Sequence, residues 1–167
     1  MFGTTPMQKA DKSTDGFPDP SLDYRQHPQA YRIGHGERGV LTVQPYKSEL
    51  LPLWHFKTPA EAEISSQALY KAFEQYKQAQ DFVGMDMARK FLQMGYTRAR
   101  RYARHRTGRK YAPDGSELPI ELDEEKQQSA EIFQVLLRQV RNDEVYQELK
   151  RKHQQQVLAG RKSARSA

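Results

Sequence analysis

The sequence predicts a small α+β domain, mainly helical, in which an N-terminal β-hairpin packs on three or four helices. Two observations support this prediction. β-branched and aromatic residues flank a glycine-rich segment between residues 31 and 43, as in a hairpin. From residue 58 onward, apolar residues recur at intervals of three and four, the period of an amphipathic helix. A chain of 167 residues has the length of one compact domain.

The hairpin is expected to join a short strand at residues 31–33 to a second strand at residues 40–43. The segment between them, Gly34–Gly39, matches GxGxxG, but a dinucleotide-binding loop needs a helix after it, and a strand-like run follows here. We interpret the segment as a hairpin turn, with a phosphate-binding glycine flap as the alternative. Two strands are marginal alone, so the apolar run at residues 50–56 is expected to cover them.

Capping residues mark the starts of three helices. Thr58, followed by Pro59 and Glu61, forms a capping box for a first helix that is expected to end near residue 80. Asp81 is expected to cap a second helix, to about residue 106, and Asp123 a third. A short fourth helix is expected after residue 143.

The inner faces of these helices follow from the spacing of their apolar residues. The face of the first helix comprises Ile64, Ala68, Leu69, Ala72, Phe73 and Tyr76. The second helix presents a narrow arc of Ala88, Phe91, Leu92, Gly95, Ala99, Tyr102 and Ala103. Gly95 and the alanines of this arc should allow a neighbouring helix to approach closely. For the fourth helix we expect inner positions at Val145, Tyr146, Leu149 and His153.

Both ends of the chain are expected to lie outside the compact domain. Residues 1–27 combine glycines and prolines with polar residues and have no periodic pattern, which predicts an irregular leader. Residues 28–158 are expected to form the single domain. Residues 159–167 lack an apolar anchor and are predicted to be a disordered basic tail.

The composition excludes several classes of protein. The chain has no cysteine, which excludes disulfides, a thiol nucleophile and cysteine-bound metals. The five histidines form neither HxxxH nor HExxH, so we expect no metal and no cofactor. No apolar run approaches the about 18 residues that a membrane helix needs, and no secretory signal is evident. We therefore expect a soluble cytoplasmic protein; the sequence does not indicate its oligomeric state.

The positive charge is concentrated in two segments. Of the 27 lysines and arginines, nine lie within residues 89–110 and six within residues 150–167, and neither segment contains an acid. The remaining 12 basic residues stand against all 21 acidic ones. An acidic body with two basic segments is typical of a protein that binds a polyanion or an acidic partner; internal ion pairing between the body and the basic segments is the alternative.

The end of the second helix is the main candidate site. Seven of the 13 residues from 98 to 110 are basic, and six of them are arginines, whose planar guanidinium groups suit bidentate contacts with phosphate or carboxylate. The basic residues are Arg98, Arg100, Arg101, Arg104, Arg106, Arg109 and Lys110. The tyrosines among them, which could stack on bases, are Tyr96, Tyr102 and Tyr111.

We expect this segment to bind nucleic acid or another polyanion without catalysis. A second hypothesis is a small enzyme in which the arginines clamp a phosphorylated or carboxylated molecule while His105 or Asp86 handles protons. Asp86 can also form ion pairs with Arg89 or Lys90, three and four residues further on. A third hypothesis is a basic module that docks on an acidic protein, and a fourth is that the arginines pair with acids of the chain itself.

Two stretches of the chain resemble a known family. They are residues 31–47, beginning YRIGHGERGVLTV, and residues 81–102, DFVGMDMARKFLQMGYTRARRY. Both are similar to sequences of small bacterial and phage proteins grouped as domain of unknown function 4385. The resemblance covers about residues 24–153. It implies a single domain and marks the hairpin and the second helix as important, but it implies no activity.

Overall fold

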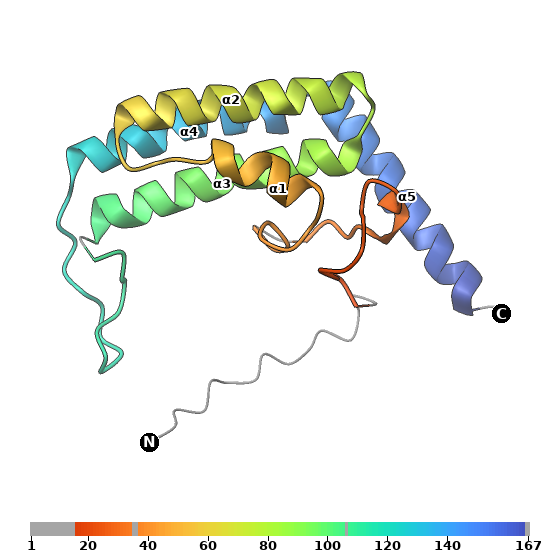
Figure 1. Ribbon diagram of the computed structural model, residues 1–167. Coiled ribbons are helices and arrows are strands. Elements are labelled where there is room, and N and C mark those ends of the chain that lie inside the picture. The colour runs from red at the N-terminus through yellow and green to blue at the C-terminus, as the bar shows by residue number, and fades with distance from the viewer. Residues whose placement is uncertain (1–15, 35–36, 106, 166–167) are drawn as a thin grey trace.

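The computed structural model describes residues 16–34, 37–105 and 107–165. The long helices α2 (Pro59–Gln78), α3 (Phe82–Arg104) and α4 (Glu124–Arg141) pack side by side as a bundle in which each contacts the other two (Figure 1). The short helix α1 (Tyr46–Leu50) lies against α3. Helix α5 (Glu144–Arg165) contacts α3 and the 3-10 turn η1 (Pro28–Ala30), and it extends away from the bundle. A second 3-10 turn, η2 (Leu51–Leu53), follows α1.

The three predicted helix starts are confirmed. Thr58, Asp81 and Asp123 are the N-cap residues of α2, α3 and α4. Each side chain accepts a hydrogen bond of 3.1 Å from the backbone N–H three residues further on. These bonds satisfy N–H groups that have no partner within the helix, which is why short polar residues are favoured at these positions.

The predicted N-terminal β-hairpin is wrong. The residues described between 16 and 58 include no strand, and residues 37–43 form turns. Instead, Tyr31, Val40 and Val43 are buried in the core beneath α3. β-Branched and aromatic residues favour strands because they fit a half-buried surface, and an irregular segment packed on a helix offers such a surface too. The alternative of a glycine flap between two strands fails for the same reason.

The fold is therefore mainly α rather than α+β, and several details of the helices also differ from expectation. Ile64, predicted on the inner face of α2, is 73% exposed, and Val145 of α5 is 40% exposed. Helix α5 has 22 residues instead of being short. Residues 159–165, predicted as disordered tail, continue α5 in the structure, and residues 166–167 lie outside its described part.

The predicted leader has two parts in the structure. Residues 1–15 lie outside the described residues. Residues 16–27 are irregular, as expected, but Phe17 and Tyr24 are buried and make edge contacts with the Tyr31 ring at 5.5 and 6.3 Å between centroids. The segment therefore belongs to the core and helps to hold the Tyr31 ring in place.

Helix α3 is the central element, but its two halves differ. Every residue from Phe82 to Leu92 is buried, so this half is enclosed on all sides. Gly95 allows the close approach of α4, because a Cβ at this position would lie 2.5 Å from the Phe133 ring. Beyond Gly95 the helix buries only one side, at Ala99 and Ala103. The burial pattern thus encloses the charges of the first half and exposes those of the second.

Candidate functional site

The second half of α3 carries three of the predicted arginines on its outside. Arg98, Arg101 and Arg104 are exposed, and none of them forms an ion pair with a residue that the structure describes. They follow one another at intervals of three, so they share one side of the helix over about 9 Å of its axis. We call these three residues the α3 arginine surface.

The other predicted basic residues are placed differently. Arg100 is half-buried, and its Nη1 atom donates a 3.1 Å hydrogen bond to the hydroxyl of Tyr96. Arg109 and Lys110 are exposed in the loop after α3, and Lys110 Nζ lies 3.9 Å from an exposed carboxylate of that loop. Arg106 lies outside the described residues. The structure therefore separates the predicted cluster into a helical surface and a loop.

The predicted stacking residues differ in how much of each ring is available. Tyr102 stacks on Phe56, with centroids 6.1 Å apart, and a Cβ at Gly108 would lie 2.8 Å from the Tyr102 ring. Neighbouring groups therefore cover much of this ring. Tyr111 is 53% exposed, and Lys110 Nζ lies 5.5 Å from its centroid. Of the three predicted rings, that of Tyr111 is the most accessible.

The two predicted proton-handling residues lie far apart. His105 follows the last residue of α3, is buried, and has an Nδ1 atom that makes no hydrogen bond to the described residues. Asp86 lies 19 residues earlier, on the first turns of the same helix, which corresponds to about 28 Å along its axis. They cannot act on one small substrate, and Asp86 does not face the α3 arginine surface.

Asp86 is the centre of a buried polar network. Its carboxylate is fully buried and accepts hydrogen bonds from the hydroxyl of Tyr31, from the hydroxyl of Tyr146 at 2.7 Å and from Arg89 Nε at 2.8 Å. Lys90 Nζ lies 4.0 Å from the same carboxylate and donates a 2.6 Å hydrogen bond to a backbone carbonyl in the 37–43 turns. The network therefore joins α3 to α5 and to the N-terminal segment.

The charges of this network shift one another's protonation. Burial raises the pKa of Asp86, but the nearby Arg89 and Lys90 and the hydrogen bonds outweigh burial and hold that pKa below its usual value. Burial lowers the pKa of Lys90 to about 8, although Asp86 opposes this shift. Burial and the Asp86 charge raise the pKa of Tyr31. At neutral pH, Asp86 is therefore ionised and both tyrosines act as hydrogen-bond donors.

The spacing of the charged residues indicates the pairing within this network but not its burial. The spacing correctly predicted that Asp86 can pair with Arg89, but it did not indicate that the side chains of Arg89 and Lys90 are only 7% and 0% exposed. Little in the sequence signals this burial, because Asp86, Arg89 and Lys90 lie within about 100° of one another around the helix, as they would on the exposed polar face of an amphipathic helix.

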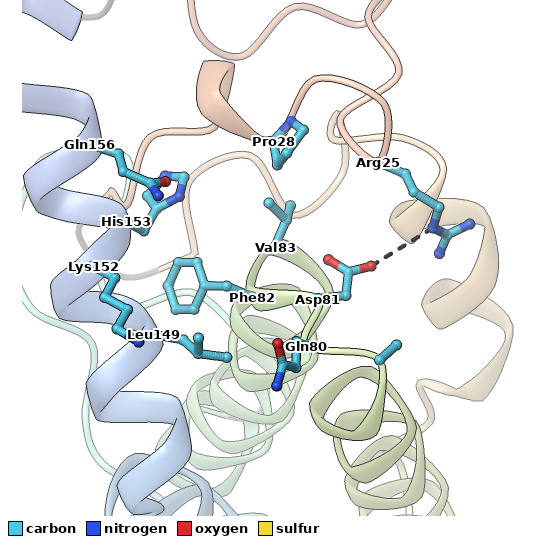
Figure 2. Close-up of a pocket in the computed structure, with 11 residues that line it drawn as sticks. Arg25, Pro28, Gln80, Asp81, Phe82, Val83, Leu149, Lys152, His153 and Gln156 are labelled. Atoms are coloured by element: carbon cyan, nitrogen blue, oxygen red, sulfur yellow. Dashed lines mark ion pairs between the residues drawn. The ribbon is translucent and has the colours of Figure 1, made fainter. Parts of the chain in front are cut away.

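A surface cavity of about 540 Å³ lies at the start of α3, between this helix, α5 and the N-terminal segment (Figure 2). Phe82 and Leu149 supply apolar wall, and Asp81 forms an ion pair with Arg25 at 3.7 Å. His153 Nε2 contacts the Tyr31 carbonyl at 2.7 Å, and burial lowers the pKa of His153. Arg25 and Asp81 in the lining are already paired, and Lys152, the remaining cation of the lining, lies 3.7 Å from a carboxylate oxygen of Glu148 on its own helix, so the cavity has no strong preference for either sign of ligand.

Two further observations concern metals and membranes. Within the described part of the chain, acidic and histidine side chains do not gather in groups of three or more that could hold a metal ion. In the same residues, no helix combines the length and the apolar character needed to cross a bilayer.

Comparison with known proteins identifies the family. Neither a search of curated proteins nor a search of solved structures finds a match. A family model described as "Domain of unknown function (DUF4385)" matches residues 15–156, which includes all of α1 to α4 and the first part of α5. The match confirms the family resemblance seen in the sequence, and the chain belongs to the DUF4385 family.

Proposed function

We propose that the protein binds nucleic acid, without catalysis, through the α3 arginine surface. The observation that carries this proposal is the exposure of Arg98, Arg101 and Arg104 without an ion-pair partner among the described residues. Guanidinium groups form bidentate contacts with phosphate, and neutralising phosphates releases counterions, which drives binding irrespective of sequence.

A purely structural role explains only part of this surface. Arg101 and Arg104 lie in the last turn of α3, where cations stabilise the helix dipole. Arg98 lies outside that turn, and the dipole effect is confined to it. The helix dipole therefore does not account for the placement of Arg98.

The accessible ring of Tyr111 favours nucleic acid over an acidic protein as the partner. Stacking of a base on an aromatic side chain contributes about 1–3 kcal/mol and tolerates any base. Arg109 and Lys110 directly precede this tyrosine and are exposed. An acidic protein would use the cations but would gain nothing specific from the ring.

The test is a salt titration of binding to labelled duplex DNA, single-stranded DNA and single-stranded RNA. Three phosphate contacts should give a slope of log K against log salt of about −2.7 on duplex. Replacing two of the three arginines, in the variant Arg101→Gln/Arg104→Gln, should reduce that slope to about −0.9 and weaken all sequences alike. Both side chains are exposed, so the melting temperature should fall only slightly, through the loss of two favourable charges at the end of the helix.

The matched control is Lys71→Gln/Arg138→Gln, which removes the same charge from exposed positions on α2 and α4. It should keep the parental slope. If the control loses as much affinity as the α3 variant, the effect is one of net charge and the proposed surface is wrong. Absence of binding to all three probes at low salt would exclude the function altogether.

A further inference from the structure

A second surface cavity, of about 360 Å³, lies beside the buried network, at the middle of α3. It is bounded by α3, the end of α4, the first turns of α5 and the backbone at Gly34. Three of the residues that line it are cationic, Arg89, Arg141 and Lys150, and no carboxylate is among the described residues that line it.

A single glutamine holds the two arginines of this cavity together. The Oε1 atom of Gln93 accepts a 2.8 Å hydrogen bond from Arg89 Nη1 and a 3.1 Å hydrogen bond from Arg141 Nη2. One amide oxygen therefore fixes two guanidinium groups side by side, from two different helices. On the other side, Arg89 Nε is held by Asp86 at 2.8 Å, so the buried guanidinium has little freedom to turn away.

The acids nearby do not neutralise this cluster. Asp86 is the only carboxylate in contact with Arg89 among the described residues, and it also faces Lys90 at 4.0 Å. Arg141 and Lys150 form no ion pair with a described residue. Like charges held this close repel each other, and an anion placed between them would remove the repulsion.

The end of a helix does not explain the placement of Arg141. Arg138 and Arg141 both lie in the last turn of α4, where either could stabilise the helix dipole. Arg141 alone of the two contacts Gln93 and lines the cavity. The contact with Gln93 and the position in the cavity lining therefore distinguish Arg141 from Arg138, for which stabilisation of the helix end is a sufficient explanation.

We propose that this cavity binds the oxyanion group, phosphate or carboxylate, of a small molecule. The two guanidinium groups match the planar, bidentate geometry that such a group accepts, and Lys150 adds a third positive charge from α5. The Tyr146 hydroxyl already donates to Asp86, so its part is to position the network behind Arg89. The site is separate from the α3 arginine surface and does not depend on the proposed binding of nucleic acid.

The test is isothermal titration of the full chain with inorganic phosphate and, in a second arm, with malonate, each against chloride at equal ionic strength. Phosphate or malonate should bind with a stoichiometry of one and raise the melting temperature above that in chloride. The stronger of the two identifies which oxyanion the site prefers. If neither binds more strongly than chloride, the proposal is wrong.

The decisive variants are Arg141→Gln and its matched control Arg138→Gln, which lose the same charge from the same turn of α4. Arg141→Gln removes a charged hydrogen-bond partner and should lower the affinity for the oxyanion about ten- to hundredfold. The control should bind like the parent. The pair Lys150→Gln and Arg151→Gln repeats the comparison on α5, with the effect expected only at Lys150. Equal losses in test and control variants would overturn the proposal.

The two proposals fail independently. Arg141→Gln should leave the salt slope of nucleic-acid binding unchanged, and Arg101→Gln/Arg104→Gln should leave phosphate affinity unchanged. If the Arg101→Gln/Arg104→Gln variant loses phosphate affinity, the anion binds at the α3 arginine surface and the cavity is not the site.

Discussion

The two halves of α3 place the same types of charged residue in opposite surroundings. Arg89 and Lys90, in the first half, are buried together with Asp86. Arg98 and Arg101, in the second half, are exposed and have no acid beside them among the described residues. One helix therefore contains cations that lie beside a buried carboxylate and cations that form no ion pair with the described part of the chain.

The difference arises from what surrounds each half rather than from the helix itself. Helix α5 and the N-terminal segment supply Tyr146 and Tyr31 to the first half, and these hydroxyls complete the hydrogen bonding of Asp86. The second half has α2 and α4 along one side only. Burial of a charge is tolerated where its hydrogen bonds are complete, so the boundary near Gly95 separates a satisfied interior from an exposed surface.

The largest expected effect comes from comparing the same substitution, arginine to glutamine, made separately in each half of α3. Arg89→Gln should lower the free energy of unfolding by about 3–5 kcal/mol, because it leaves the buried carboxylate of Asp86 without its closest cation. Arg98→Gln should change it by less than about 0.5 kcal/mol. Urea unfolding measures both. Arg89→Lys keeps the positive charge and should therefore lower the free energy of unfolding less than Arg89→Gln does. Equal stability of Arg89→Gln and Arg98→Gln would contradict the comparison.

The next effect is a pH dependence that only the buried half should produce. The pKa of Lys90 is about 8 in the folded protein, below the value of about 10.4 for an exposed lysine. Between these values the unfolded chain binds the extra proton, so the free energy of unfolding should increase as pH rises from 8, by about 3 kcal/mol in total. Lys90 is charged in both states below pH 8, and there its contribution no longer varies.

Urea unfolding of the parent and of Lys90→Met between pH 7 and 9.5 tests this expectation. The rise in stability should be present in the parent and absent in the variant. The range stops short of pH 10 because the raised pKa of Tyr31 acts in the opposite direction there: the unfolded tyrosine loses its proton first, and stability falls. The same pH dependence in parent and variant would assign the titration to another group.

The third expectation compares two tyrosine hydroxyls. Tyr146→Phe removes a 2.7 Å hydrogen bond to the buried, ionised Asp86 and should lower the free energy of unfolding by about 1.5–3 kcal/mol. Tyr96→Phe removes the acceptor of a 3.1 Å bond from half-buried Arg100 and should cost about 0.5 kcal/mol. Thermal unfolding of the two variants checks the order. A larger loss in Tyr96→Phe would contradict it.

These contrasts also show how far the sequence could predict the structure. The helix starts at Thr58, Asp81 and Asp123 were predictable because an N-cap acts through atoms only three residues away. The nonexistent hairpin was predicted from residue types whose preference depends on packing with distant parts of the chain. Tyr31 illustrates the limit, because its hydrogen-bond partner Asp86 lies 55 residues further on.

The candidate sites show the same limit. The α3 arginine surface could be predicted as a cluster because its members are neighbours in the sequence. The cavity could not, since Arg89, Arg141 and Lys150 come from three different helices and only the fold brings them together. In this cavity Arg89 and Arg141 are joined through Gln93, which bears no charge, so no pattern of charges in the sequence indicated the contact.

The smallest expected effect concerns Gly95, at the boundary between the halves. A Cβ there would lie 2.5 Å from the Phe133 ring, so Gly95→Ala must push α3 and α4 apart or turn the ring. Overpacking of this kind costs about 1–3 kcal/mol, and the better helix propensity of alanine offsets about 1 kcal/mol of it. We expect a net loss of about 1 kcal/mol in the free energy of unfolding, measured by urea unfolding.

Gly160→Ala in α5 is the control, because no neighbouring side chain lies within 4 Å of a Cβ there, and it should stabilise the protein slightly. A double-mutant cycle with Phe133→Leu should show that the two substitutions are not additive, because the smaller side chain makes room for the methyl group. If the two effects simply add, the contact between Gly95 and Phe133 does not set the spacing of α3 and α4, and the boundary must depend on other contacts.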